Sequence, residues 1–175
     1  MFEPFREPVF EKGRRCYNAV TLAAWLSEDD DTQGCSNVDP VTHEPFTFAE
    51  RLAIFHSIGA VDPRTHRLFV MLAKTTMGAD TMQARLSGLD DVTRMATVRY
   101  SMQPSGLTLL MHTAVEARPD CCSAVLKVCS DPTYVNAVDS YGHTALSVLF
   151  HWNIARDWSW NDQAEAVATM LVRPL

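Results

Sequence analysis

Lysine is scarce in this chain of 175 residues. It occurs three times, at Lys12, Lys74 and Lys127, whereas arginine occurs twelve times. Two explanations of this imbalance stay open: a codon bias, or selection against modification of the chain's own lysines. The sequence also has no basic run beyond residues 12–15, and its formal net charge is −6. Because nucleic-acid binders need a basic face to neutralise phosphates, the composition predicts no nucleic-acid partner.

Long apolar runs are missing as well. No segment approaches the ~20 consecutive apolar residues that span a bilayer. Residues 1–8 mix both charges with two prolines and lack the basic start and apolar stretch of a secretory signal. We therefore expect a soluble cytoplasmic protein with no membrane partner. If the chain is a pathogen effector or a viral protein, the expected location is the host cytosol.

The cysteines lack the spacing of a metal or redox site. The chain has five, an odd number, with no C-x-x-C pair of the kind found in zinc ribbons and redox motifs. They are Cys16, Cys35, Cys121, Cys122 and Cys129. We expect reduced, structural thiols, no metal and no cofactor. A hydrolase or transferase that uses Cys16 or Cys35 as a nucleophile is one alternative function.

The first third of the chain predicts a small mixed module of strands and helices. The apolar pair Val9-Phe10, followed by Gly13, indicates a short hairpin within residues 1–18. Residues 19–26 have the composition of a short apolar helix, and the acidic run that follows ends it. A polar loop is expected at residues 28–38.

A second helix is expected over residues 48–58. Thr47 and Glu50 have the spacing of a capping box, in which each side chain binds the other residue's backbone N–H group. Apolar residues then recur close to every 3.6 positions, and Gly59 is a natural end signal. We place a domain boundary after residue 62, which divides the chain into residues 1–62 and 63–175.

The second part of the chain alternates helical segments with short breakers. The expected helices span residues 67–76, 79–86, 91–101, 108–117, 120–129, 144–153 and 162–173. Residues 106–110, Gly-Leu-Thr-Leu-Leu, recur as Gly-His-Thr-Ala-Leu at 142–146, which is 36 residues later. Short helices in pairs with a repeated turn indicate a helical repeat array.

This pattern resembles the ankyrin repeat, a turn and two helices with a period of about 33 residues. The resemblance covers about 70 residues, 103–173, and departs from the family in its T-P-L-H box and in an inserted loop at 154–160. It implies protein binding through turn tips and inner helices. The implied substrate-binding residues are Tyr141, Trp158 and Trp160. Trp152 is a further candidate, for which a core position is the preferred interpretation.

An ordered set of residues in the N-terminal part resembles the U-box, a zinc-free relative of the RING domain. The matching residues are Phe2-Glu3-Pro4-Phe5-Arg6-Glu7-Pro8-Val9, Gly13, Tyr17, Leu22, Trp25-Leu26 and Asp39-Pro40-Val41-Thr42. The resemblance implies an E3 ubiquitin-protein ligase that works without a covalent intermediate. Its implied partners are a ubiquitin-conjugating enzyme, ubiquitin and a protein substrate.

The resemblance also implies where the conjugating enzyme binds. The implied groove residues are Phe2, Leu22, Trp25, Pro40 and His43. His43 stands where the family often has an arginine or lysine that contacts both the conjugating enzyme and its ubiquitin. Because a module this small usually needs a metal or an equivalent brace, polar side chains near Arg6, Glu7 and Asp39 are expected to hold the loops.

Two other interpretations stay open. In a rival alignment, residues 39–42 form the first loop and residues 62–65 the second, so that the groove lies at Val41, Ile54 and Pro63. In a different functional class, the chain is a non-enzymatic ankyrin-type scaffold with a degenerate N-terminal cap. The preferred fold is α+β: a U-box-like module followed by ankyrin-like repeats.

Overall fold

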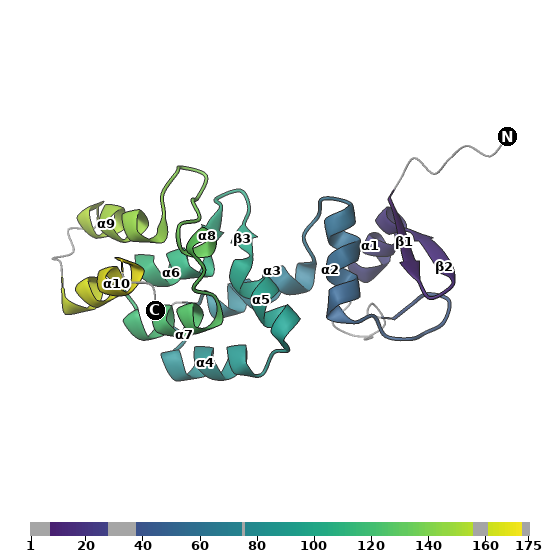
Figure 1. The fold of residues 1–175 in the computed structure, drawn as a ribbon, viewed down its shortest axis with the longest axis horizontal. Helices are drawn as coiled ribbons and strands as arrows, with labels where there is room; N and C mark the ends of the chain where they lie inside the picture. The colour runs from purple at the N-terminus through teal and green to yellow at the C-terminus, as the bar shows by residue number, and fades with distance from the viewer. Residues whose placement is uncertain (1–7, 28–37, 75, 156–160, 173–175) are drawn as a thin grey trace. The chain divides into compact units, whose positions relative to one another are not determined.

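The computed structural model describes residues 8–27, 38–74, 76–155 and 161–172. The chain divides into two compact units, which we call unit 1 (residues 1–64) and unit 2 (residues 65–175). The described part is helix-rich with small two-stranded antiparallel ribbons, and its class is α+β (Figure 1). No described helix is long and apolar enough to cross a membrane.

Unit 1 begins with the expected hairpin. Strand β1 (Val9–Lys12) pairs antiparallel with β2 (Arg15–Asn18), with Val9 opposite Asn18 and Lys12 opposite Arg15. The two-residue turn requires a left-handed backbone, and Gly13 supplies it with φ of +62°.

Two helices complete unit 1. Helix α1 (Ala19–Ser27) packs on α2 (Phe48–Ser57), which starts with the predicted reciprocal cap between Thr47 and Glu50. The apolar faces enclose a small core of Leu22, Ala23, Leu26, Phe46, Ile54 and Phe55.

A buried ion pair lies beside this small core. The Arg51 guanidinium donates to both carboxylate oxygens of Asp62, at 3.2 and 2.9 Å, and to the Leu26 carbonyl at 3.2 Å. Both side chains of the pair are almost completely buried. The pair therefore joins three segments of unit 1: the end of α1, the middle of α2 and the chain that follows α2.

Helix α3 begins at the boundary between the units, and the other elements of unit 2 follow in chain order. The elements are α3 (Pro63–Leu72), α4 (Ala79–Ser87), α5 (Asp91–Arg99), β3 (Ser101–Met102), β4 (Leu107–Thr108), α6 (Leu109–Val115), α7 (Pro119–Val128), α8 (Pro132–Val135), α9 (Ala145–Ala155) and α10 (Asp162–Val172). The sequence predicted seven of these helices, and it missed the one-turn helix α8 and the β3–β4 ribbon.

Helices α6 and α7 form one pair in unit 2, and α9 and α10 form a second pair. The two pairs stack, with α6 packed on α9 and α7 packed on α10 (Figure 1). Helix α4 extends the stack on the other side of α7. One continuous apolar core runs through these layers, from Phe69 to Leu171. Stacking is what stabilises such layers, because one helix pair alone leaves its apolar face in water.

The described cysteines are free thiols, and three of them lie in the unit 2 core. Burial raises the pKa of Cys122 to about 12, although Thr113 lies within hydrogen-bond distance of its sulfur. A thiolate is therefore disfavoured at this position, and the side chain packs as a small apolar group.

Candidate functional site

A tight loop at residues 38–45 is held by several hydrogen bonds, and we call it the docking loop. Its centre is the buried Asp39 carboxylate, which accepts the N–H groups of Val41 and Thr42 at 2.8 and 2.9 Å. The Tyr17 hydroxyl donates to the other carboxylate oxygen at 2.5 Å. One aspartate thus fixes the loop backbone and ties it to β2.

The charge of Asp39 is stabilised by these contacts. Burial by itself raises the pKa of the carboxyl group, but hydrogen bonds from Tyr17, Thr42 and Val41 and the nearby charge of Arg15 outweigh it. The net result lowers the pKa of Asp39 to about 2. The carboxylate is therefore ionised at neutral pH and acts as a permanent acceptor for the loop.

The two ends of the docking loop are held together and to the rest of unit 1. Val38 and Pro45 form an isolated antiparallel bridge. The Lys12 ammonium donates to the Pro45 carbonyl at 3.0 Å, lies 3.5 Å from the Glu50 carboxylate, and sits 4.2 Å above the Phe46 ring. A side-chain cation of β1 thus anchors the end of the loop.

Trp25 contacts the start of the docking loop from the last turn of α1. Its indole N–H donates to the Val38 carbonyl at 3.1 Å, yet 39% of the residue stays exposed. On the loop itself, Pro40 is exposed and Val41 is 60% exposed. We call these three residues the unit 1 surface. It is an apolar patch whose backbone is fixed by internal hydrogen bonds.

The residues predicted for the conjugating-enzyme groove have different positions in the structure. Trp25, Pro40 and His43 are exposed, and all three belong to the docking loop or contact it. Leu22, by contrast, is buried in the unit 1 core, so it supports α1 from beneath and offers no surface to a partner. Phe2 lies outside the described residues.

His43 has an unusual backbone. Its φ of +58° lies in the left-handed region, which few residues other than glycine adopt. The conformation turns the chain back so that the His43 N–H bonds to the Asp39 carbonyl at 2.9 Å. The imidazole is exposed at this turn.

The polar brace of unit 1 was predicted only in part. Asp39 takes the expected role, whereas Arg6 and Glu7 lie outside the described residues. Sequence reasoning missed the Arg51–Asp62 pair, although Arg51 falls on the apolar stripe of α2, four residues before the buried Phe55. A charged residue within an apolar stripe is the signal that could have found it. The rival groove is disfavoured because Ile54 has no exposed surface.

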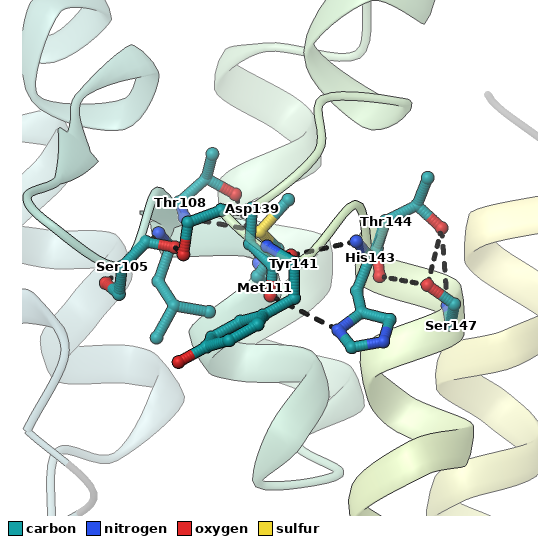
Figure 2. Close-up of polar contacts among 10 residues, drawn as sticks. Ser105, Thr108, Met111, Asp139, Tyr141, His143, Thr144 and Ser147 are labelled. Atoms are coloured by element: carbon teal, nitrogen blue, oxygen red, sulfur yellow. Dashed lines mark hydrogen bonds and ion pairs between the residues drawn. The ribbon is translucent and has the colours of Figure 1, made fainter.

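The second candidate surface is the turn that precedes α9 in unit 2 (Figure 2). One Asp139 oxygen accepts the N–H groups of Tyr141 and His143 at 2.9 and 2.8 Å, and the other lies 3.5 Å from the His143 ring. The Thr144 hydroxyl accepts the Ser147 N–H at 3.3 Å and so caps the first turn of α9. Thr108 caps α6 in the same way, by accepting the Met111 N–H at 3.3 Å.

This turn packs directly on the corresponding turn of the preceding helix pair. The N–H and the hydroxyl of Ser140 both donate to the Ser105 carbonyl, each at 2.9 Å. A Cβ atom on Gly106 would lie 2.9 Å from the Ser140 nitrogen, which is closer than real Cβ contacts come. Gly142, 36 residues later, has the same left-handed backbone with open space around it. Gly106 is therefore required by the stacking of the turns.

The tip of the turn exposes aromatic rings. Tyr141 is 81% exposed, and its ring lies 6.2 Å from that of His143, which stacks on His151 at 5.1 Å. Trp152, interpreted from the sequence as a core residue, is 42% exposed and lies edge-on to His151. The core interpretation was wrong because Trp152 lies near the end of α9, beyond the buried turn that contains Val148 and Leu149. Trp158 and Trp160 lie outside the described residues.

Two other chemistries are a metal site and a cysteine nucleophile. No group of three or more histidine, cysteine, aspartate or glutamate side chains there is arranged to hold a metal ion. Cys16 is an exposed residue of β2, and Cys35 lies outside the described residues.

No protein-family model, curated protein or solved structure matches this chain.

Proposed function

We propose that this chain is an E3 ubiquitin-protein ligase in which unit 1 recruits a charged ubiquitin-conjugating enzyme and unit 2 holds a protein substrate. The observation that carries the proposal is the unit 1 surface. Trp25 stays partly exposed against a docking loop that is fixed by the Asp39 carboxylate, and Pro40 and Val41 stand exposed on that loop. This combination supports the U-box-like interpretation of the sequence.

The unit 1 surface has the physical properties of a docking site. Exposed aromatic side chains dominate the energy of protein interfaces, because they bury a large rigid area on contact. The partner meets a loop whose backbone is already ordered by Asp39, so little conformational entropy is lost on binding. A small apolar patch of this kind suits a transient partner that arrives charged and leaves empty.

Such a ligase needs no nucleophile of its own. The conjugating enzyme carries ubiquitin as a thioester, and an amine of the substrate attacks it. The ligase contributes by holding the two reactants close and in a favourable orientation. This chemistry is compatible with buried cysteines such as Cys122, whose thiol form is stabilised.

Unit 2 supports the substrate-binding half of the proposal. Its stacked helix pairs and bonded turns support the ankyrin-like interpretation, in which turn tips bind proteins. Tyr141 is the best placed of the predicted contact residues, because it is exposed at the tip of a turn that Asp139 rigidifies. A substrate held there need contribute only an accessible lysine.

The proposal is tested by discharge of a ubiquitin-loaded conjugating enzyme onto free lysine. With a responsive enzyme from a panel, the full chain accelerates discharge, and Trp25→Ala reduces the acceleration about thirtyfold, as expected for loss of a central aromatic anchor. Val41→Asp serves as a second variant that leaves the core intact, because Val41 is exposed. It is expected to abolish the acceleration.

A matched control separates docking from folding. Val61→Ala removes an exposed apolar side chain of unit 1 that lies outside the docking loop, and it should leave discharge unchanged. Thermal unfolding of each variant is measured in parallel. Discharge that is unaffected by Val41→Asp, in a chain that remains folded, contradicts the proposed surface.

The second candidate function is a non-enzymatic binding scaffold. The observation that favours it is His43, which occupies the exposed position where U-box proteins often have a cation. The variant His43→Arg separates the two functions. Faster discharge with this variant supports the ligase, whereas no acceleration by either form with any conjugating enzyme supports the scaffold.

A further inference from the structure

The three lysines of the chain differ sharply in how available their amines are. They are the only side-chain amines in 175 residues, so they are the only lysines on which a ligase of this kind can modify itself. Lys12 belongs to unit 1, whereas Lys74 and Lys127 belong to unit 2. Their environments determine which of them can act as an acceptor.

The Lys12 amine, on β1, holds the end of the docking loop. It donates to the Pro45 carbonyl, pairs with Glu50 and lies over the Phe46 ring, and only 15% of its side chain is exposed. To react, Lys12 must give up all three contacts and release the end of the loop. The only lysine of unit 1 is therefore occupied by a structural role.

No such contacts are seen for the two lysines of unit 2 among the described residues. Lys74 follows α3 and is exposed, and its carbonyl, not its amine, takes part in the local hydrogen bonds with Met77 and Arg118. Lys127 is exposed in the last turn of α7. Neither amine has a polar partner among the residues that the structure describes.

We propose that self-ubiquitination of this chain occurs on Lys74 and Lys127 and spares Lys12, so that the docking module is protected from its own activity. This inference rests on the proposed ligase function. It also gives the scarcity of lysine a physical consequence. The single lysine of unit 1 has its amine in structural contacts, and both acceptor lysines lie in the unit that is proposed to hold the substrate.

The reaction at each acceptor is an acyl transfer. The neutral lysine amine attacks the thioester carbonyl of ubiquitin, a carbon–nitrogen bond forms, and the carbon–sulfur bond breaks. The cysteine of the conjugating enzyme leaves as a thiolate, and the amine loses its extra proton to solvent. The step requires an amine that is free to approach, and this condition distinguishes Lys74 and Lys127 from Lys12.

The test maps the ubiquitin remnant on each lysine by mass spectrometry after reaction of the full chain. We expect remnants on Lys74 and Lys127, and at least about tenfold less on Lys12, because its amine must first break a hydrogen bond and an ion pair. The double variant Lys74→Arg/Lys127→Arg should lose most of the modified product. Modification of Lys12 at a rate similar to that of Lys74 overturns the inference.

A matched variant tests whether the contacts themselves protect Lys12. Arg14→Lys places an amine two residues away, in an exposed turn of the same hairpin. We expect this new amine to be modified while Lys12 in the same molecule is not. If the new amine is also spared, protection does not come from the contacts of Lys12 and the inference fails.

Two further measurements distinguish failure of this inference from failure of the proposed function. Discharge onto free lysine reports the ligase activity alone, so remnants on Lys12 in a chain that accelerates discharge overturn only the inference. A chain that accelerates no discharge overturns both. A small amine-reactive ester, which needs no enzyme, should acetylate Lys74 and Lys127 about tenfold faster than Lys12 in the folded chain and equally in urea. Equal rates in the folded chain also contradict the inference.

Discussion

Unit 1 and unit 2 are stabilised by different kinds of interaction. Unit 1 has a core of a few apolar side chains and relies on two buried polar centres, the Asp39 carboxylate and the Arg51–Asp62 pair. Unit 2 has one apolar core that runs through its stacked helices. A small unit buries a small fraction of its surface, so its loops need specific polar contacts to hold one conformation.

The two kinds of interaction also suit different functions. Apolar contacts are non-directional and tolerate small shifts of the side chains, whereas a buried carboxylate with fixed hydrogen bonds specifies the path of the backbone. The polar centres lie in the unit whose loop is proposed to dock a partner. The stacked unit instead repeats one turn, whose exposed tip is proposed to bind a substrate.

The largest expected effect comes from breaking the buried ion pair of unit 1. Arg51→Met leaves the Asp62 carboxylate buried without its partner, which should lower the free energy of unfolding of unit 1 by about 3–5 kcal/mol. Hydrogen exchange, read separately for peptides of each unit, should show loss of protection in α1 and α2. Protection in α7 and α10 should change little.

The control for this prediction is the double variant Arg51→Met/Asp62→Leu. It replaces both charges with apolar groups of similar size and should recover most of the stability. If the single variant is as stable as the parent chain, unit 1 does not depend on its polar centre and the contrast between the units is lost.

An intermediate effect is expected from the turns of unit 2. Gly106→Ala combines the strain of a left-handed backbone with a clash against the Ser140 turn, and together these should cost about 2–4 kcal/mol. Gly142→Ala is the matched control, because it has the same strain without the clash and should cost about 1–2 kcal/mol. Both free energies are measured by chemical denaturation. Equal losses in the two variants would contradict the inferred contact between the turns.

The smallest effect is a loss of stability in acid that comes from Asp39. Its pKa in the folded chain, about 2, is below the ordinary value of 3.8, so its ionised form is stabilised by folding. This contribution is fully present well above pH 3.8 and is lost as the pH falls from there toward 2. Unit 1 should therefore lose protection against hydrogen exchange over this range.

The variant Tyr17→Phe sharpens the acid prediction. It removes one of the hydrogen bonds that lower the pKa of Asp39, so the folded pKa lies nearer 3.8 and the loss in acid should be smaller and complete at a higher pH. Asp39→Asn should remove this part of the pH dependence. Identical acid curves for the parent chain and Asp39→Asn would show that the docking loop does not depend on the carboxylate.

Local patterns predicted the helices and the hairpin well. The Thr47–Glu50 capping box and the Gly13 turn both appear as expected, since these contacts form between residues that are close in sequence. The one-turn helix α8 and the two-residue strands β3 and β4 were missed because segments so short have no periodicity to detect.

The candidate site was less predictable than the helices, because it depends on contacts between distant residues. Trp25 and Pro40 are both exposed, and Trp25 contacts the docking loop through the Val38 carbonyl, while Leu22 faces the core because its place on α1 is set by packing against α2. Arg51 and Asp62 are eleven residues apart, and only the fold shows that they meet. Trp152 was misplaced because hydrophobicity alone does not show how far along a helix the buried contact extends.

By itself, the sequence determined the N-terminal hairpin and the longer helices, the 36-residue recurrence of the turn and the scarcity of lysine. Tertiary structure alone decided which charges are buried, which aromatic rings remain exposed and that the Lys12 amine is occupied. The physical reason is one of range. Capping, turns and helical periodicity depend on neighbours within a few residues, whereas burial and ion pairing depend on segments that only the folded chain brings together.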